Sequence, residues 1–322
     1  TFTDWQAVNG YEATQLDLWI GNPNFIPNTL RDAFICYDEE TDAFYATGSF
    51  WGVEDLRRGA TMFRSKDLLQ WEAMPMLYEY KDLKKDGFIA EQDHAKFDEL
   101  IKKDAIGDNW RFRIQIGEQK IWRLDGEYYM NMQTFCSPGG HFLLKSQTGK
   151  ITGPYKPVQE IAGVADLMQD DDGAIIFNSG GSSNRRFPDV ASFVGNHKTQ
   201  WRKFPSVEFA HVEPWLQNIC FSEDCEAGIM KIGGKYVTWS TDWTGSYDAI
   251  YRYSDSWDGP YQGQMRILPY GGNGKFFQDR DGQWFYTYFN NSNEYISRSQ
   301  NRGRMNMYPV FVGFEKGELV IE

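Results

Sequence analysis

Residues 166–179 read DLMQDDDGAIIFNS and show the pattern on which the fold prediction rests. An apolar segment runs into a polar turn that ends in Asp172-Gly173, and a second apolar segment follows. An Asp-Gly pair between two β-prone segments is a hairpin signal, because type I′ turns need positive φ angles. The stretch therefore predicts two antiparallel strands joined by a tight turn.

The same pattern occurs five times along the chain. Three further copies turn at Gly-Gly or Asp-Gly, whereas the first copy turns through the longer Glu40-Thr41-Asp42. Repetition of one supersecondary unit is the signature of a repeat architecture. The five copies are Ala33–Ser49, Lys120–Gln133, Asp166–Ser179, Gly228–Thr241 and Lys275–Asn290.

A weaker segment follows each hairpin and consists of a strand, a polar bend and a short stretch with Trp or Gly-Pro-Tyr. Two hairpins make a four-stranded sheet, and repeated sheets of this kind are the blades of a β-propeller. The sequence therefore predicts an all-β, five-bladed β-propeller. The five weaker segments are Met62–Glu72, Phe142–Tyr155, Ser192–Phe204, Ile250–Tyr261 and Tyr295–Met305.

Three segments lie outside this pattern. Residues 1–30 precede the first copy, and we expect them to wrap the propeller or to help close the last blade. The insertion 81–117 lies between blades one and two, and its segment Asp93–Ala105 has apolar residues at helical spacing, which predicts a short amphipathic helix. The last strands, Pro309–Gly313 and Glu318–Ile321, are expected to complete a blade.

The bulk composition limits the kinds of partner. The formal net charge of −12 argues against nucleic acid and anionic membrane surfaces, which attract basic proteins. No apolar run has the length of a membrane span. The chain starts at Thr1 without a leader, as a processed exported protein would, so we expect a secreted or periplasmic location. No Pro-, Gly- or Ser-rich linker divides residues 1–322, which predicts a single domain.

The four cysteines are Cys36, Cys136, Cys220 and Cys225, and none forms a CxxC pair. With only four histidines as well, a zinc cluster is not expected. Cys220 and Cys225 are explained equally well by a disulfide across a short loop and by free buried thiols.

Three carboxylates share one location relative to the repeats. Asp32 precedes the first strand of blade one, Asp166 begins that of blade three, and Glu226 lies just ahead of that of blade four. The innermost strands of a propeller line its central funnel, so these acids would converge there. One such acid alone is better explained as a carboxylate that binds backbone N–H groups in a turn. Three at matching positions favour a functional site.

Several phrases carry a resemblance to a known family: RSKDLLQWE, DLMQDDDG, EAGIMKIGGKYV, SDSWDGPY and GKFFQDRDGQW. From about Arg31 to Asn290 the chain resembles glycoside hydrolase family 43 and related five-bladed furanosidases and xylosidases. The family's acids lie at the starts of blades one, three and four. The resemblance implies Asp32 as general base, Asp166 as orienter and pKa modulator, and Glu226 as general acid.

These roles agree with the chemistry of an inverting glycosidase. The base activates a water on one face of the sugar while the acid protonates the leaving oxygen. A charged Asp166 nearby would raise the pKa of Glu226, because like charges disfavour ionisation.

The chain departs from the family at three points. Ala33 replaces the proline that usually follows the base, and Ala227-Gly228 replaces the usual Gly-Pro after the acid, which keeps Glu223 and Asp224 as rival acids. Asn273 replaces a histidine associated with a central metal or water site, which puts a bound calcium in doubt. We therefore expect no cofactor and no metal.

The stretch 178–189 contains Arg185 and Arg186, which could hold a carboxylate or sulfate on a sugar. The alternative is a surface loop whose arginines pair with the protein's own carboxylates. Five further residues are candidates for binding substrate, each with ordinary packing as its alternative: Trp51, His141, Trp215, Phe221 and Asn273.

The sequence thus predicts an exo-acting inverting glycoside hydrolase that removes a terminal arabinofuranose, xylose or galactose from plant or algal polysaccharide fragments. A funnel narrowed by the insertion 81–117 and by residues 1–30 favours a pocket over an open cleft. Two alternatives stay open: a non-catalytic carbohydrate-binding propeller and a retaining fructosidase of the family 32 type, whose Asn-Asp-Pro-Asn-Gly phrase is absent. The sequence leaves the anomer, the linkage and the oligomeric state open.

Overall fold

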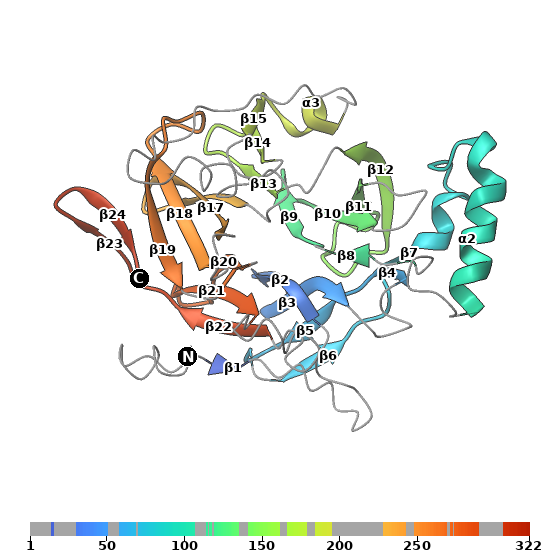
Figure 1. The fold of residues 1–322 in the computed structure, drawn as a ribbon, viewed down its shortest axis with the longest axis horizontal. Helices are drawn as coiled ribbons and strands as arrows, with labels where there is room; N and C mark the ends of the chain where they lie inside the picture. Colours follow the sequence, from blue (N-terminus) through green and yellow to red (C-terminus); the bar gives the residue numbers. More distant parts are fainter. Residues whose placement is uncertain are drawn as a thin grey trace. The chain divides into compact units, whose positions relative to one another are not determined.

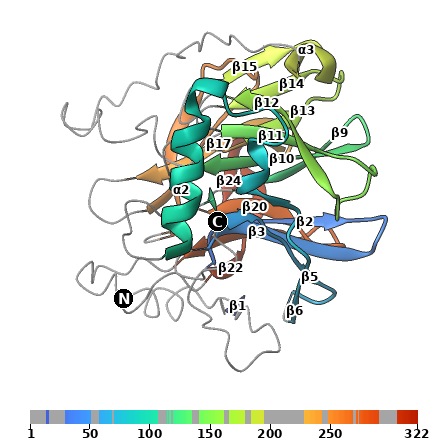
Figure 2. The same ribbon diagram turned by 90° about the vertical axis from the view of Figure 1, so that its right-hand side faces the viewer.

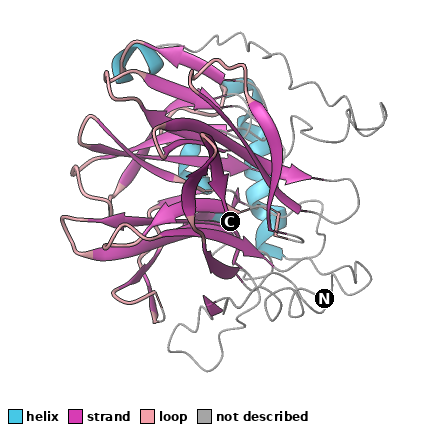
Figure 3. Ribbon diagram, turned by 90° about the vertical axis from the view of Figure 1, so that its left-hand side faces the viewer, coloured by secondary structure: helices cyan, strands magenta, loops and turns pink. Residues whose placement is uncertain are grey.

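The computed structural model describes the chain in fifteen stretches, and its strands make an all-β protein (Figures 1 and 3). The chain divides into two compact units, an N-terminal unit of Leu18–Ala162 and a C-terminal unit of Gly163–Glu322 together with Thr1–Asp17. The described residues are 14–15, 30–50, 58–68, 70–106, 114, 116–117, 119–134, 141–161, 166–178, 184–194, 228–242, 248–268, 271–272, 274–289 and 305–322.

The N-terminal unit contains two antiparallel sheets and one short ribbon. In the first sheet the strand order is β2-β3-β5-β6, and in the second it is β12-β11-β10-β8, with β9 also paired to β10. The first sheet is made of β2 (Leu30–Asp38), β3 (Ala43–Phe50), β5 (Phe63–Ser65) and β6 (Trp71–Ala73). The second is made of β8 (Ile116–Gly117), β9 (Ile121–Leu124), β10 (Glu127–Thr134), β11 (His141–Ser146) and β12 (Tyr155–Ile161). The ribbon pairs β4 (Gly59–Ala60) with β7 (Tyr78–Glu79).

The predicted amphipathic helix is confirmed as α2 (His94–Ile106), which follows the 3-10 turns η2 (Tyr80–Leu83) and η3 (Glu91–Asp93). It lies on the outside of the unit beside η2 and the β4–β7 ribbon (Figures 1 and 2). Phe97 is buried from the helix and stacks on Tyr80 with ring centroids 5.3 Å apart. These rings join the apolar core that also packs between the unit's two sheets.

The C-terminal unit contains three antiparallel sheets and a terminal ribbon. The first sheet is made of β13 (Asp166–Gln169), β14 (Ile175–Asn178) and β15 (Asn184–Phe187). The second is made of β16 (Gly228–Ile232), β17 (Lys235–Asp242), β18 (Asp248–Ser254) and β19 (Gln262–Leu268). The third has the order β1-β22-β21-β20 and is made of β20 (Lys275–Gln278), β21 (Trp284–Phe289), β22 (Met305–Pro309) and β1 (Thr14–Gln15). The ribbon pairs β23 (Val312–Glu315) with β24 (Glu318–Ile321).

All five predicted hairpins are confirmed, as the pairs β2–β3, β9–β10, β13–β14, β16–β17 and β20–β21. The short turns work as the sequence indicated, since Gly126, Gly173, Gly234 and Gly282 all have positive φ. Within residues 1–30, the described strand β1 pairs with β22 at the outer edge of the last sheet.

Two expectations about strands were wrong. Ser192 was expected to begin a strand, but it lies in the short helix α3 (Val190–Val194), where Phe193 packs on Phe177 and Phe187. The third strand of that sheet is instead β15, earlier in the chain.

The last two strands were expected to complete a blade, but they form their own ribbon because β1 takes the outer edge of the last sheet. The ribbon is held by Tyr251, whose hydroxyl donates to the carbonyl of Leu319 and accepts from the N–H of Ile321. Across the described residues no helix is both long and apolar enough to cross a bilayer.

Candidate active site

Asp32 lies in a β-bulge near the start of β2. Arg31 pairs with Ser49 and Phe34 with Thr47, so two residues of β2 oppose one residue of β3. Asp32 is one of the two, and its φ angle is +56°. Bulges re-aim side chains beside active sites, and a positive φ at a residue other than glycine costs about 1–3 kcal/mol, which the surrounding structure must offset. Its side chain is buried, with 6% of the residue exposed.

The change from proline to Ala33 fits this backbone. The residue before a proline is pushed to extended φ values near −120°. Asp32 at +56° is far from that region. Ala33 therefore permits a bulge conformation at Asp32 that a proline at this position would oppose.

The start of β9 lies beside β3 in the same unit. The Thr47 hydroxyl donates to the carbonyl of Gln119 at 2.6 Å, and the Gln119 side chain accepts from the N–H of Thr61 at 2.9 Å. Lys120, next in the chain, is fully buried. Because Thr47 pairs with Phe34, these bonds place Lys120 close to the bulge that holds Asp32.

Asp166 occupies the equivalent place in the C-terminal unit. It is the first residue of β13 and is 3% exposed. Its Oδ1 accepts from the N–H of Leu167 at 3.1 Å, and its Oδ2 accepts from the N–H of Ile229 at 3.2 Å. The carboxylate thus joins the start of β13 to the start of β16. Glu226 precedes Ile229 by three residues and lies outside the described residues.

Gly228 allows this close approach. A Cβ at this position would lie 2.5 Å from Oδ2 of Asp166 and would overlap the ring of Trp239. Trp239 in turn donates its indole N–H to the carbonyl of Gly274 at 2.9 Å. The starts of β13, β16 and β20 are therefore packed side by side.

Lys275 is a functional candidate that the sequence reasoning missed. It begins β20 directly after Gly274 and is 1% exposed. Within the described part of the chain, its buried Nζ has no hydrogen-bond partner. The sequence repeat could have identified Lys275, because it is the first residue of the copy KFFQDRDG, just as Asp166 is the first residue of the copy DLMQDDDG.

Arg185 and Arg186, candidates for binding a sugar anion, lie in strand β15, where they pair with Phe177 and Ile176 of β14. The Arg186 guanidinium donates to Asp172, which agrees with the alternative that these arginines pair with the protein's own carboxylates. Arg185 lies over the ring of Phe187, 5.0 Å from its centroid.

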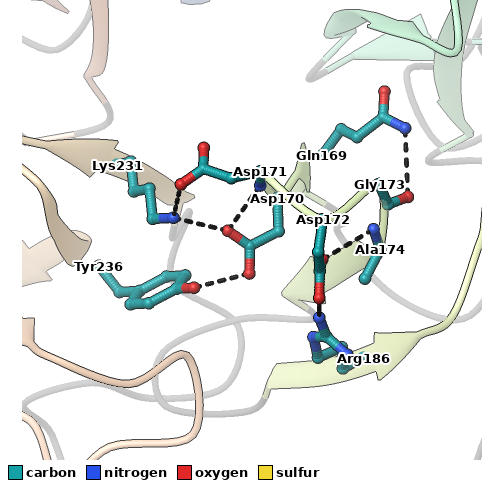
Figure 4. A network of polar contacts seen from close by, with 9 residues as sticks. All are labelled: Gln169, Asp170, Asp171, Asp172, Gly173, Ala174, Arg186, Lys231 and Tyr236. Carbon is teal, nitrogen blue, oxygen red and sulfur yellow. Dashed lines mark hydrogen bonds and ion pairs between the residues drawn. The ribbon is translucent and has the colours of Figure 1, made fainter.

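The turn after β13 carries a separate network of charges (Figure 4). Lys231 donates to Asp170 at 2.8 Å and to Asp171 at 2.5 Å, and the Tyr236 hydroxyl donates to Asp170 at 2.6 Å. Burial alone would raise the pKa of Asp170, but these hydrogen bonds together lower it below its ordinary value. At Asp172, the N–H of Ala174 and then Arg186 lower the pKa. The network joins the sheets that contain β13 and β16.

His141 begins β11, directly opposite Gln133 of β10. It is partly buried, and burial lowers the pKa of its imidazole. Cys36 is a free thiol whose pKa is raised by burial to about 12. No group of residues with metal-ligand geometry is found in the described stretches. Several earlier candidates lie outside the described residues: Trp51, Cys136, Trp215, Cys220, Phe221, Glu223, Asp224 and Asn273.

Comparison with known proteins places the fold. No family model and no curated sequence matches the chain. Solved structures do match, with TM-scores above 0.5 at low identity. A bifunctional GH43-CE protein of Bacteroides eggerthii has a TM-score of 0.65 at 18% identity over 97% of this chain. This chain spans 35% of the length of that protein.

Two other matches carry ligands. A GH43 enzyme from Xanthomonas citri has a TM-score of 0.63 at 14% identity over 98% of this chain and 96% of its own. The same enzyme was also solved with xylose and with xylotriose. An exo-beta-1,3-galactanase from Phanerochaete chrysosporium, solved with beta-1,3-galactotriose, has a TM-score of 0.58 at 14% identity over 97% of this chain and 66% of its own. This chain therefore has the fold of the family 43 glycoside hydrolases, which are β-propellers.

Proposed function

We propose that this protein is an exo-acting, inverting glycoside hydrolase in which Asp32, Asp166 and Glu226 carry the chemistry. The observation that carries the proposal is the Asp166 carboxylate, buried at the start of β13 and bonded to the N–H of Ile229 in β16. A buried acid held by backbone donors, on a fold shared with glycoside hydrolases, is suited to tuning a neighbouring acid.

Glu226 is the general acid in this proposal. In the sequence Glu226 precedes Ile229, whose N–H binds the Asp166 carboxylate, by three residues. A negative charge on Asp166 would raise the pKa of Glu226 and keep it protonated until it donates to the leaving oxygen. Asp32 is the general base. Its position in a strained β-bulge supports this role, because bulges and strained residues are common where a functional side chain is held in place.

The five sheets would be the blades of a single five-bladed propeller made by the whole chain. Each sheet begins with one of the repeated hairpins, and β1 completes the last one. In an inverting mechanism the base and the acid lie about 6.5–9.5 Å apart.

The substrate class follows from the same proposal. The similar structures include complexes with xylose, xylotriose and beta-1,3-galactotriose, so a chain-end pentose or galactose residue is the first choice. Action at chain ends is proposed by analogy with the similar exo-beta-1,3-galactanase. The proposed activity favours a secreted or periplasmic protein, because polysaccharides lie outside the cell.

The test is release of a monosaccharide from natural plant and algal oligosaccharides, followed by chromatography. Asp32→Asn and Glu226→Gln should each lower the rate about 10²-fold or more. Glu223→Gln and Asp224→Asn serve as matched controls and should leave it unchanged. NMR of the fresh product should show an inverted anomeric centre.

Two outcomes would contradict the proposal. If a control abolishes release and Glu226→Gln does not, the acid is misassigned. If the wild type cleaves nothing in the panel but binds an oligosaccharide, the protein is a carbohydrate-binding propeller.

A further inference from the structure

We propose that Lys275 binds an anionic substituent of the substrate, a carboxylate or sulfate on the terminal sugar, and so selects acidic glycans. The inference rests on the proposed function for the location of the substrate. It concerns a residue that carries no role in the chemistry described above.

Burial of Lys275 is the first observation. The residue is 1% exposed, and its Nζ has no hydrogen-bond partner among the residues that the structure describes. Lysines are almost never fully buried unless they are paired, because an ammonium without an anion loses its hydration without compensation. A bound anion would supply the partner.

The location of Lys275 is the second observation. Gly274, immediately before it, accepts the indole N–H of Trp239, and Trp239 packs on Gly228 beside the Asp166 carboxylate. Lys275 therefore stands in the same row of strand starts as Asp166. A sugar that reaches the Asp166 carboxylate would therefore also come close to the ammonium group of Lys275.

The side chain of Lys275 leaves the apolar core. Neighbouring residues on a strand point to opposite faces, and Phe276 packs on Trp239 and Tyr286 with centroids 5.1 and 4.9 Å away. Lys275 lies on the other face, opposite Thr287 of β21. The ammonium therefore points away from the packed aromatic cluster.

Three other cations among the described residues of this unit have partners of their own. Arg186 donates to Asp172, Arg185 lies on Phe187, and Lys231 donates to Asp170 and Asp171. The acidic net charge of the protein would repel an anionic substrate, so selecting one requires a cation at the site.

A pairing of Lys275 with Glu226 is the less favourable reading. An ammonium beside a carboxyl group lowers its pKa, whereas a general acid needs a raised one. The substrate is the better partner for this charge.

The experiment compares sugars that differ only in charge. Binding of galacturonate, galactose 6-sulfate and neutral galactose is measured by calorimetry for the wild type, Lys275→Met and Lys275→Arg. Lys231→Met is the matched control, because it removes a cation from the neighbouring strand β16. The carboxylate and sulfate arms identify which anion is bound.

We expect the wild type to bind one acidic sugar more tightly than galactose, with an affinity that falls as salt rises. Lys275→Met should weaken that binding about tenfold or more and leave galactose binding unchanged. Lys275→Arg should keep part of the preference, and Lys231→Met should keep all of it.

The inference is overturned if the wild type binds galactose as tightly as both acidic sugars, or if Lys275→Met weakens all three alike. The wild-type preference and the Lys275→Arg variant decide the matter if Lys275→Met does not fold. Neutral oligosaccharide cleavage that depends on Asp32 but shows no acid preference would retain the hydrolase and reject this role of Lys275. Acidic-sugar binding that depends on Lys275, without cleavage of any oligosaccharide, would retain this role of Lys275 and reject the hydrolase.

Discussion

The two ends of β13 hold the same residue type in opposite surroundings. At the turn end, Asp170, Asp171 and Asp172 meet Lys231, Tyr236 and Arg186 (Figure 4). At the other end, four residues away, the Asp166 carboxylate accepts from the N–H groups of Leu167 and Ile229.

The difference separates a structural acid from a candidate catalytic one. Cations at the turn end neutralise the carboxylates and join two sheets. The N–H groups of Leu167 and Ile229 fix the position of the Asp166 carboxylate at the starts of β13 and β16. On the proposed mechanism, this is the carboxylate that acts on the neighbouring general acid.

The largest expected effect is on activity, from amide substitution at the two ends. On the proposed mechanism, Asp166→Asn should lower the cleavage rate about 10²-fold and shift the alkaline limb of the pH profile to lower pH, because loss of the Asp166 charge lowers the pKa of the proposed general acid, Glu226. Asp170→Asn should keep the rate. Kinetics across pH 4–8 checks both, and equal losses in the two variants would erase the distinction.

Backbone packing gives the next effect. Gly228→Ala should cost about 1–3 kcal/mol in unfolding free energy and lower activity, because the new Cβ meets Trp239 and Asp166. Gly173→Ala at the turn end has a positive φ of +85° but nothing within 4 Å of the new Cβ. It should cost about 1 kcal/mol through backbone conformation alone and leave activity intact. Urea unfolding and rate assays separate the two cases.

Removing the cation at the turn end should have a smaller effect, with a definite pH dependence. Lys231→Met should lower the unfolding free energy by about 1 kcal/mol at neutral pH, since Lys231 is partly exposed. The pKa of Asp170 is lowered in the folded state, so its contribution is present above the ordinary value of 3.8 and is lost as pH falls through the folded value. Unfolding at pH 3 and pH 7 should therefore show the two proteins converging in acid.

The smallest expected effect belongs to Arg186. Its partner Asp172 is exposed, so Arg186→Gln should lower the melting temperature less than Lys231→Met and only at low salt. Acidic-sugar binding should be unchanged. A loss of that binding would return Arg186 to the substrate site and weaken the assignment of Lys275.

Much of the fold was predictable because its signals are local. An Asp-Gly or Gly-Gly turn between two apolar segments defines a hairpin within about fifteen residues, and all five hairpins formed as expected. The spacing of Phe97 and Leu100 predicted α2 in the same way. β15 was missed because NSGGSSNRRFPD is rich in turn residues, and it is pairing with β14 that makes Asn184–Phe187 a strand.

The candidate site depended on contacts between residues distant in sequence. The repeat placed Asp166 and Lys275 at the first residue of their copies and Asp32 one residue ahead of its copy. Tertiary structure alone decided what each position means: the bulge at Asp32, the bond from Asp166 across 63 residues to Ile229, and the burial of Lys275. The physical reason is that residue type and strand position are set by neighbours along the chain, whereas burial and charge pairing are set by the strands packed alongside.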